Sequence, residues 1–214
     1  MTPDGADLGD QRRERPVVAE RTVHTGRVFD LVSRTVDLGE AGTVTREYLR
    51  HPGAVAVVAL DEAERVLMIR QYRVPVAAYL WEIPAGLLDG GAQETLLGAA
   101  QRELAEEADI AAARWDVLVD YATTPGGSDE VLRIFLARDL RPVTDSDFVR
   151  EGEEAEIEVR WVPLAEAVAA VLAGRIHNPS AVAGLLAAER VLRTGSVPRP
   201  VAADWALRDS PRPA

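Results

Sequence analysis

The sequence predicts an α/β protein, an α/β/α sandwich with a mixed sheet, preceded by a small N-terminal antiparallel β subdomain. Short runs rich in Val, Ile and aromatic residues, typical of strands, occur along much of the chain. Two or three segments instead repeat their apolar residues with helical periodicity. Residues 16–50 contain strand patterns alone, too little for an independent core. This part is therefore expected to pack on the main domain or on a second subunit.

The N-terminal part begins with a polar segment and continues as strands. Residues 1–15 are rich in Gly, Asp and Arg, which predicts disorder. In the β subdomain at 16–50, strands are predicted over 17–24, 28–37 and 43–50, with Gly turns between them.

The main domain is predicted over residues 51–195. It opens with a buried strand, AVAVVAL at 54–60, and a hairpin partner, RVLMIRQYR at 65–73. A short strand, WEIPAG, then leads to a helix. The remaining elements are strands at 115–124, 131–140 and 157–163, helices at 164–173 and 179–194, and a Pro-rich irregular tail at 196–214.

An acidic face distinguishes the helix that follows WEIPAG. Glu103 and Glu107 lie one turn apart and Glu106 falls beside them, within an arc of about 100° that contains no basic side chain. Like charges four residues apart destabilise a helix by about 0.2–0.5 kcal/mol per pair. A divalent cation would reverse the sign of that effect. Oxygen ligands that leave positions open for water and substrate suit Mg²⁺ or Mn²⁺, which commonly hold phosphates.

The opposite face of this helix is apolar and can bury against a sheet. Arg102 precedes Glu106 by four positions and can pair with it. A solvated acidic helix with one ion pair is the alternative, but the Gly-rich turn and the strand-like run before the helix favour a metal site. The apolar stripe consists of Leu96, Ala100, Leu104 and Ala108.

The segment that begins at Gly86 resembles the box of the Nudix hydrolases, G-x5-E-x7-R-E-U-x-E-E-x-G-U, where U is a bulky aliphatic residue. The match is close from Glu94 through the run RELAEE at 102–107. Two departures occur: seven residues separate Gly86 from Glu94 instead of five, and Asp109 replaces the late Gly. The longer loop costs little closure entropy, and Asp can adopt the left-handed conformation that ends a helix.

The resemblance implies a Nudix-type fold and metal-assisted hydrolysis of a pyrophosphate, with Mg²⁺ or Mn²⁺ as the cofactor. By the same resemblance, Glu103 and Glu107 are the principal metal ligands and Glu106 is auxiliary. The main-chain oxygen of Ala85 completes a site, and Arg102 orients the carboxylates.

Features outside the box resemble the bacterial ADP-ribose pyrophosphatases over most of residues 20–195. Pro125 lies fifteen positions beyond Ile110, where members acting on ADP-ribose carry a Pro, although a Pro-Gly-Gly turn is also an ordinary loop. The resemblance implies cleavage of ADP-ribose to AMP and ribose 5-phosphate, by a homodimer with exchanged N-terminal strands that serve dimerisation. A Nudix enzyme for another nucleoside diphosphate sugar, such as GDP-mannose, and a non-catalytic nucleotide sensor are the alternatives.

The resemblance also assigns a catalytic base and substrate contacts. The base is expected in the acidic segment REGEEAEIEV, with Glu154 first and Glu153 or Glu156 in reserve, unless that run is simply a solvated loop. Phe29 could stack on adenine, although a Phe between strands is more often part of a core. The expected substrate contacts are Phe29, Arg46, Glu47, Arg73, Glu82 and Pro125.

Composition excludes several classes of site. The chain has no Cys, which excludes thiol catalysis, disulfides and Cys-based zinc sites. It has no Lys, which excludes a Schiff-base or P-loop lysine. A formal charge of −11 argues against binding to nucleic acid or to anionic membranes. Without a signal peptide or membrane-spanning run, a cytoplasmic location is expected.

Overall fold

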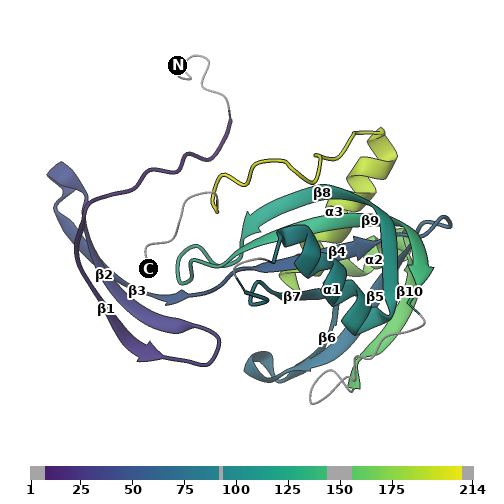
Figure 1. The fold of residues 1–214 in the computed structure, drawn as a ribbon, viewed down its shortest axis with the longest axis horizontal. Coiled ribbons are helices and arrows are strands. Elements are labelled where there is room, and N and C mark those ends of the chain that lie inside the picture. Colours follow the sequence, from purple (N-terminus) through teal and green to yellow (C-terminus); the bar gives the residue numbers. More distant parts are fainter. Residues whose placement is uncertain (1–7, 92–93, 144–155, 209–214) are drawn as a thin grey trace.

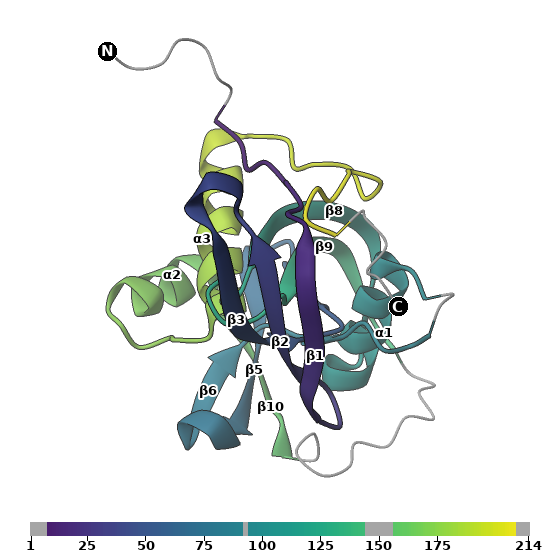
Figure 2. The same ribbon diagram turned by 90° about the vertical axis from the view of Figure 1, so that its left-hand side faces the viewer.

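The computed structural model of the protein describes residues 8–91, 94–143 and 156–208. A three-stranded antiparallel sheet lies beside a larger α/β body (Figure 1). Figure 2 shows the molecule with this sheet toward the viewer. Its strands are β1 (Val17–Thr25), β2 (Asp30–Asp37) and β3 (Thr43–Arg50), with a short 3-10 turn, η1 (Gly39–Ala41), between the last two. The three predicted N-terminal strands are thus confirmed. None of the helices in the described residues is long and apolar enough to cross a membrane.

The body contains two further sheets. One has the order β7-β4-β9-β8 and is mixed, because β4 and β9 run parallel while the other pairs are antiparallel. The other is antiparallel, with the order β10-β5-β6. Their strands are β4 (Ala54–Ala59), β5 (Arg65–Arg73), β6 (Ala78–Glu82), β7 (Ala85–Leu87), β8 (Ile110–Ala122), β9 (Val131–Pro142) and β10 (Glu158–Pro163), and η2 (Val74–Val76) joins β5 to β6.

The predicted hairpin of 54–60 with 65–73 is wrong. Strands β4 and β5 join different sheets, and only an isolated antiparallel bridge between Leu60 and Val66 follows the expected hairpin pairing. Both edges of β4 are occupied by β7 and β9, so β5 pairs with β6 and β10 instead. The WEIPAG run is also two strands, which separate at Ile83 and Pro84 because Pro has no N–H for a ladder.

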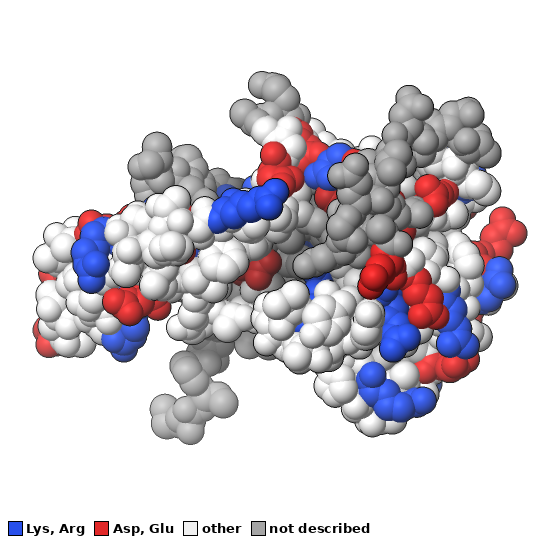
Figure 3. Space-filling model, turned by 90° about the horizontal axis from the view of Figure 1, so that it is seen from below, with Lys and Arg blue, Asp and Glu red and all other residues white. Residues whose placement is uncertain are grey.

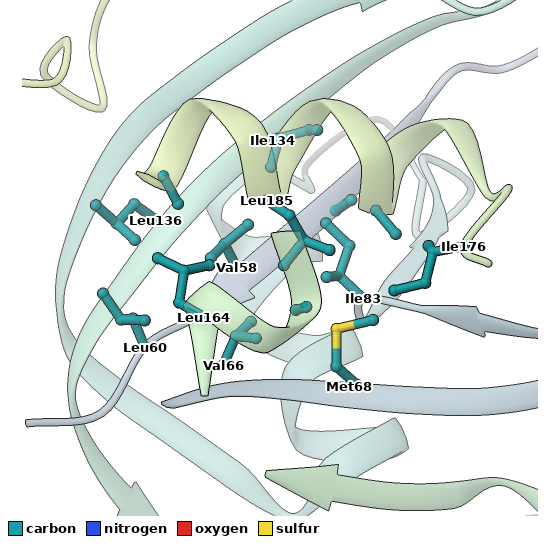
Figure 4. Close-up of a cluster of buried hydrophobic side chains, with 14 of the residues drawn as sticks. Val58, Leu60, Val66, Met68, Ile83, Ile134, Leu136, Leu164, Ile176 and Leu185 are labelled. Atoms are coloured by element: carbon teal, nitrogen blue, oxygen red, sulfur yellow. The ribbon is translucent and has the colours of Figure 1, made fainter. Parts of the chain in front are cut away.

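Helices cover both faces of the mixed sheet, which confirms the α/β/α sandwich. α1 (Leu96–Ala108) packs on one face, and α2 (Leu164–Leu172) and α3 (Pro179–Thr194) lie over the other. Strand β4 is apolar throughout because alternate residues enter both cores, Val57 beneath α1 and Val58 beneath α3. Figure 4 shows the second core, where Ile83, Ile134 and Leu185 meet.

The N-terminal sheet is attached to the body mainly through the end of β3. Leu49 donates its N–H to the carbonyl of Gly127 (2.9 Å) and accepts from the N–H of Asp129 (3.0 Å). Every residue of β1 is exposed, with Val17 at 53% and Val18 at 60%. Seen from below, broad uncharged areas separate the charged side chains of this sheet (Figure 3). A single chain therefore leaves much apolar surface of the sheet in solvent.

Candidate active site

Both ends of α1 are set by local chemistry. Thr95 caps the N-terminus, where its Oγ1 accepts the N–H of Gly98 (2.9 Å). Asp109 ends the helix in the left-handed conformation (φ 54°), and its N–H donates to the carbonyl of Ala105 (3.0 Å). The structure thus confirms that Asp109 serves where a Gly is usual. The predicted stripe is confirmed as well, since Ala100, Leu104 and Ala108 are buried.

Glu103 and Glu107 point from α1 toward the backbone of β7. Their exposed fractions are only 8% and 6%. The N–H of Ala85 donates to Oε2 of Glu107 (2.9 Å). A Cβ added to Gly86 would lie 1.9 Å from Cδ of Glu103, so only Gly allows this carboxylate to approach the strand so closely. The glycine that opens the box is therefore a steric requirement of the acidic face.

Burial makes the charged forms of these two carboxyl groups costly. It raises the pKa of Glu103 to about 7, against the opposing effect of Arg102. It raises the pKa of Glu107 to about 8, where the N–H of Ala85 opposes the change and the charge of Glu103 adds to it. A cation bound beside both groups would favour their ionised forms.

Arg102 lies at the centre of an ion-pair network. Its Nε donates to Oε1 of Glu94 (2.8 Å), and its Nη1 donates to Glu103 (2.6 Å) and Glu106 (3.1 Å). The hydrogen bond from Arg102 lowers the pKa of Glu94, and the same bond raises that of Arg102. The predicted pairing of Arg102 with Glu106 is confirmed, and the long Arg102 side chain also reaches Glu103.

This network affects how a metal could bind. Among the residues that the structure describes, no three His, Asp or Glu side chains are grouped as a ready metal site. Arg102 engages two of the three carboxylates of the acidic face. The donors nevertheless fit a hard divalent cation, because two buried carboxylates, one in a cradle that a Cβ would fill, lie against the backbone of β7.

Arg73, which is partly exposed, pairs with the buried Glu82 near the acidic face. Arg73 donates from Nε and Nη2 to the two carboxylate oxygens of Glu82 (2.9 and 2.7 Å), a bidentate arrangement. Glu82 is 1% exposed. The charge of Arg73 lowers the pKa of Glu107 and that of Glu82 raises it, both less than burial does. Arg73 is thus held by a carboxylate from its own chain.

The other predicted substrate contacts lie apart from α1. Phe29 is 45% exposed and its ring stacks on His51, with centroids 6.4 Å apart, so it is not a core residue. Arg46 and Glu47 are exposed on β3 (Figure 1). Pro125 is exposed in the turn that pairs with β3. One chain therefore brings the box residues together but leaves the N-terminal candidates on a separate sheet.

The two candidate bases lie outside the described residues. Glu153 and Glu154 belong to the segment 144–155. The reserve candidate, Glu156, is described and exposed just before β10. The role of Glu94 does not follow from the sequence beyond its match to the box. In the structure its carboxylate accepts hydrogen bonds from the N–H of Gly90 (3.0 Å) and from Nε of Arg102.

Comparison with known proteins agrees with this geometry. Residues 50–183 match the NUDIX domain family. The chain belongs to this family. An ADP-ribose pyrophosphatase of Mycobacterium tuberculosis is 44% identical over 88% of this chain and 89% of its own length. Another, from Bacillus subtilis, is 33% identical over 77% of this chain and 87% of its own. The NUDIX protein also resembles a solved ADP compounds hydrolase, with a TM-score of 0.69, 25% identity and coverage of 87% and 98% of the two chains.

Proposed function

We propose that this NUDIX protein hydrolyses the pyrophosphate of ADP-ribose to AMP and ribose 5-phosphate with Mg²⁺ or Mn²⁺ as cofactor. The observation that carries the proposal is the approach of two buried carboxylates, Glu103 and Glu107, to the backbone of β7 at Ala85 and Gly86. The 44% identity to a mycobacterial ADP-ribose pyrophosphatase supports ADP-ribose as the substrate.

The residues of the box have distinct roles in this proposal. Glu103 and Glu107 are the principal ligands, Glu106 is auxiliary, and the main-chain oxygen of Ala85 completes a site. Arg102 holds Glu103 and Glu106 in place through its hydrogen bonds. A bound divalent cation would neutralise the diphosphate and lower the pKa of the attacking water.

The substrate site extends to the N-terminal sheet of a second subunit. Phe29, Arg46 and Glu47 are exposed on that sheet and could reach the acidic face of a partner. A homodimer with exchanged N-terminal strands would also cover the exposed Val17 and Val18 of β1. The Arg73–Glu82 pair borders the site from β5 and β6, and Pro125 is the proposed marker for ADP-ribose.

A substrate panel tests the function directly. Purified protein is incubated with ADP-ribose, GDP-mannose and other nucleoside diphosphate compounds in Mg²⁺, Mn²⁺ or EDTA, and products are identified by chromatography. ADP-ribose should have the highest kcat/KM, and EDTA should abolish turnover. Preference for GDP-mannose would replace the substrate assignment, and no hydrolysis of any compound would favour a nucleotide sensor.

Gly86→Ala tests the acidic face without changing a charge. The new Cβ would clash with the carboxylate of Glu103, so kcat should fall at least ~10-fold and the Mn²⁺ concentration for half activity should rise. Gly9→Ala is the control, because a Cβ at Gly9 meets no atom within 4 Å and this residue lies outside the proposed site. Equal activity of the two variants would contradict the placement of Glu103 in the site.

A further experiment separates the base from the metal ligands. Glu154→Gln should reduce kcat with little change in the affinity for Mn²⁺ or ADP-ribose, whereas Glu103→Gln should weaken Mn²⁺ binding as well. Glu153→Gln is measured in parallel. A slower Glu153→Gln enzyme moves the base by one residue, and two fast variants exclude both positions.

A further inference from the structure

The C-terminal segment 199–208 packs across the mixed sheet, beyond the family match that ends at residue 183. Figure 1 shows it in yellow, returning from α3 over β8. Arg199 forms a short antiparallel bridge with Val117 of β8, with N–H to carbonyl distances of 2.8 and 3.2 Å. Its Nη1 also lies 2.9 Å from Oδ2 of Asp120.

A buried arginine anchors this segment. Arg133 of β9 is 2% exposed, and Asp120 neutralises it through two hydrogen bonds of 2.7 and 3.0 Å. Its guanidinium also donates to the carbonyls of Ala203 (3.0 Å) and Asp204 (3.1 Å). The ring of Trp205, 2% exposed, lies 5.0 Å from this guanidinium. The guanidinium of Arg133, buried in the sheet, thus makes two of its hydrogen bonds to Asp120 and two to the C-terminal segment.

The far end of the segment reaches the start of β4. Arg208 stacks on Trp205 at 5.5 Å, and its Nη1 donates to the carbonyl of Pro52 (2.9 Å). Gly53 has φ +90°, and a Cβ there would lie 2.3 Å from Nη1 of Arg208. The Pro52–Gly53 turn and Arg208 are therefore closely fitted to each other.

This turn connects the acidic face of its own chain to the N-terminal sheet, which in an exchanged dimer would complete the partner's substrate site. On one side, the N–H of Gly53 donates to Nδ1 of His51 (3.1 Å), on whose ring Phe29 stacks. On the other side, the carbonyl of Gly53 accepts the N–H of Leu88 (3.1 Å), two residues after Gly86. Movement of the turn would shift the N-terminal sheet relative to the loop after β7.

We propose that Trp205 and Arg208 are positioning residues for substrate binding. They hold the Pro52–Gly53 turn and thereby fix the N-terminal sheet relative to the body of its own chain, in the position from which it reaches the site of the partner subunit. The inference rests on the proposed function, which takes a nucleoside diphosphate as the substrate and places the N-terminal sheet in its binding site. The proposed metal ligands lie on α1. Of the C-terminal segment, Val201 packs against the core beneath this helix and Trp205 does not. Loss of these residues should therefore affect substrate affinity more than metal affinity.

The test compares Arg208→Ala and Trp205→Ala with Arg208→Lys, Trp205→Phe and the control Arg193→Ala, an exposed ion-pair residue of α3. For the two Ala variants, KM should rise at least ~5-fold while kcat stays within about twofold, and the conservative variants should recover most of the loss. The Kd of α,β-methylene-ADP, measured by calorimetry, should rise in parallel. The half-saturating Mn²⁺ concentration should not change.

Unchanged KM and Kd in folded Arg208→Ala protein, with only a lower Tm, would overturn the inference. Arg208 is partly exposed, so Arg208→Ala should fold and can decide the test even if Trp205→Ala does not fold. The kinetics use whichever nucleoside diphosphate the wild type cleaves best. Failure of the ADP-ribose assignment is thus distinct from failure of this inference, and the Kd measurement remains informative for a protein without hydrolase activity.

Discussion

Glu107 combines three features at the residue scale: burial, a backbone donor and a second carboxyl group nearby. Its side chain accepts from the N–H of Ala85 at 2.9 Å, so its position is set by the strand rather than by a counter-charge on its own helix. Glu103 depends in the same way on Gly86, and additionally on Arg102. These environments distinguish the two groups from the acidic side chains on the surface of the molecule.

Glu107→Gln should lower turnover at least ~100-fold while the fold stays intact, because the change removes ligand charge without altering size. The Gln carbonyl can still accept the N–H of Ala85. Steady-state kinetics at saturating Mg²⁺ and a thermal melt check both parts, with Glu166→Gln on the exposed side of α2 as the control. Near wild-type turnover would show that the acidic face does not hold the metal.

In EDTA, the stability of the protein should fall as pH rises from about 5 to about 8. The folded-state pKa values of Glu103 (about 7) and Glu107 (about 8) exceed the ordinary value of 4.5, so the folded protein keeps protons that the unfolded chain has released. The stabilising effect is complete below pH 4.5 and is lost as pH passes through the folded values.

Tm measured between pH 5.5 and 8.5 checks this prediction. Glu94 and Asp61, whose pKa values are lowered by their Arg partners, are ionised throughout this range and contribute no slope. Glu107→Gln should flatten the curve, and Mg²⁺ should raise Tm more at pH 8 than at pH 6. A wild-type Tm that is constant or rises with pH would show that burial does not raise these pKa values.

At the scale of elements, residues at its two ends determine where α1 begins and ends. Thr95 satisfies an N-terminal N–H, and the left-handed Asp109 lets the chain leave the helix for β8. The pairing of the surrounding strands depends instead on distant parts of the chain. Strand β4 lies between β7 and β9, and this arrangement, rather than the turn at residues 61–64, determines where β5 pairs.

Asp109→Gly should be more stable than Asp109→Ala by about 1 kcal/mol, because Gly adopts a left-handed conformation without the Cβ penalty that Ala has. Both variants lose the Asp side chain, so the difference between them reports the cost of the left-handed backbone conformation. Urea unfolding followed by circular dichroism measures the difference. Equal midpoints would mean that position 109 is not held at φ 54° in solution.

At the scale of the whole molecule, the N-terminal sheet is the least self-sufficient part. Its contact with the body depends on Leu49 and on the turn at 127–129, while β1 remains exposed throughout. The C-terminal segment also contacts the connection between this sheet and the body, where Arg208 donates a hydrogen bond to the carbonyl of Pro52. The N-terminal sheet and the C-terminal segment therefore meet at one linker, between β3 and β4.

Deletion of residues 1–48 should produce a protein that aggregates, or a monomer with poor activity. The deleted strands have no core of their own and are proposed to complete a neighbour's site. Size-exclusion chromatography with light scattering and the ADP-ribose assay measure the two outcomes. A well-behaved, fully active monomer would argue against the exchanged dimer.

Local sequence determined the parts of this protein that depend on near neighbours. The periodicity of α1 placed Glu103 and Glu107 on one face and Leu104 on the other, and the structure places them so. The N-terminal strands and the helices at 164–172 and 179–194 also follow from local patterns. Steric and periodic effects act over a few residues, so a short window of sequence contains them.

Only the tertiary structure decided how distant segments meet. The pairing of β4 with β7 and β9 follows from competition for a buried position, which a uniformly apolar run does not encode. The reach of Arg102 to Glu94 depends on the loop before α1. The docking of Trp205 depends on Arg133, 72 positions earlier, whose burial becomes favourable only when both segments are in place.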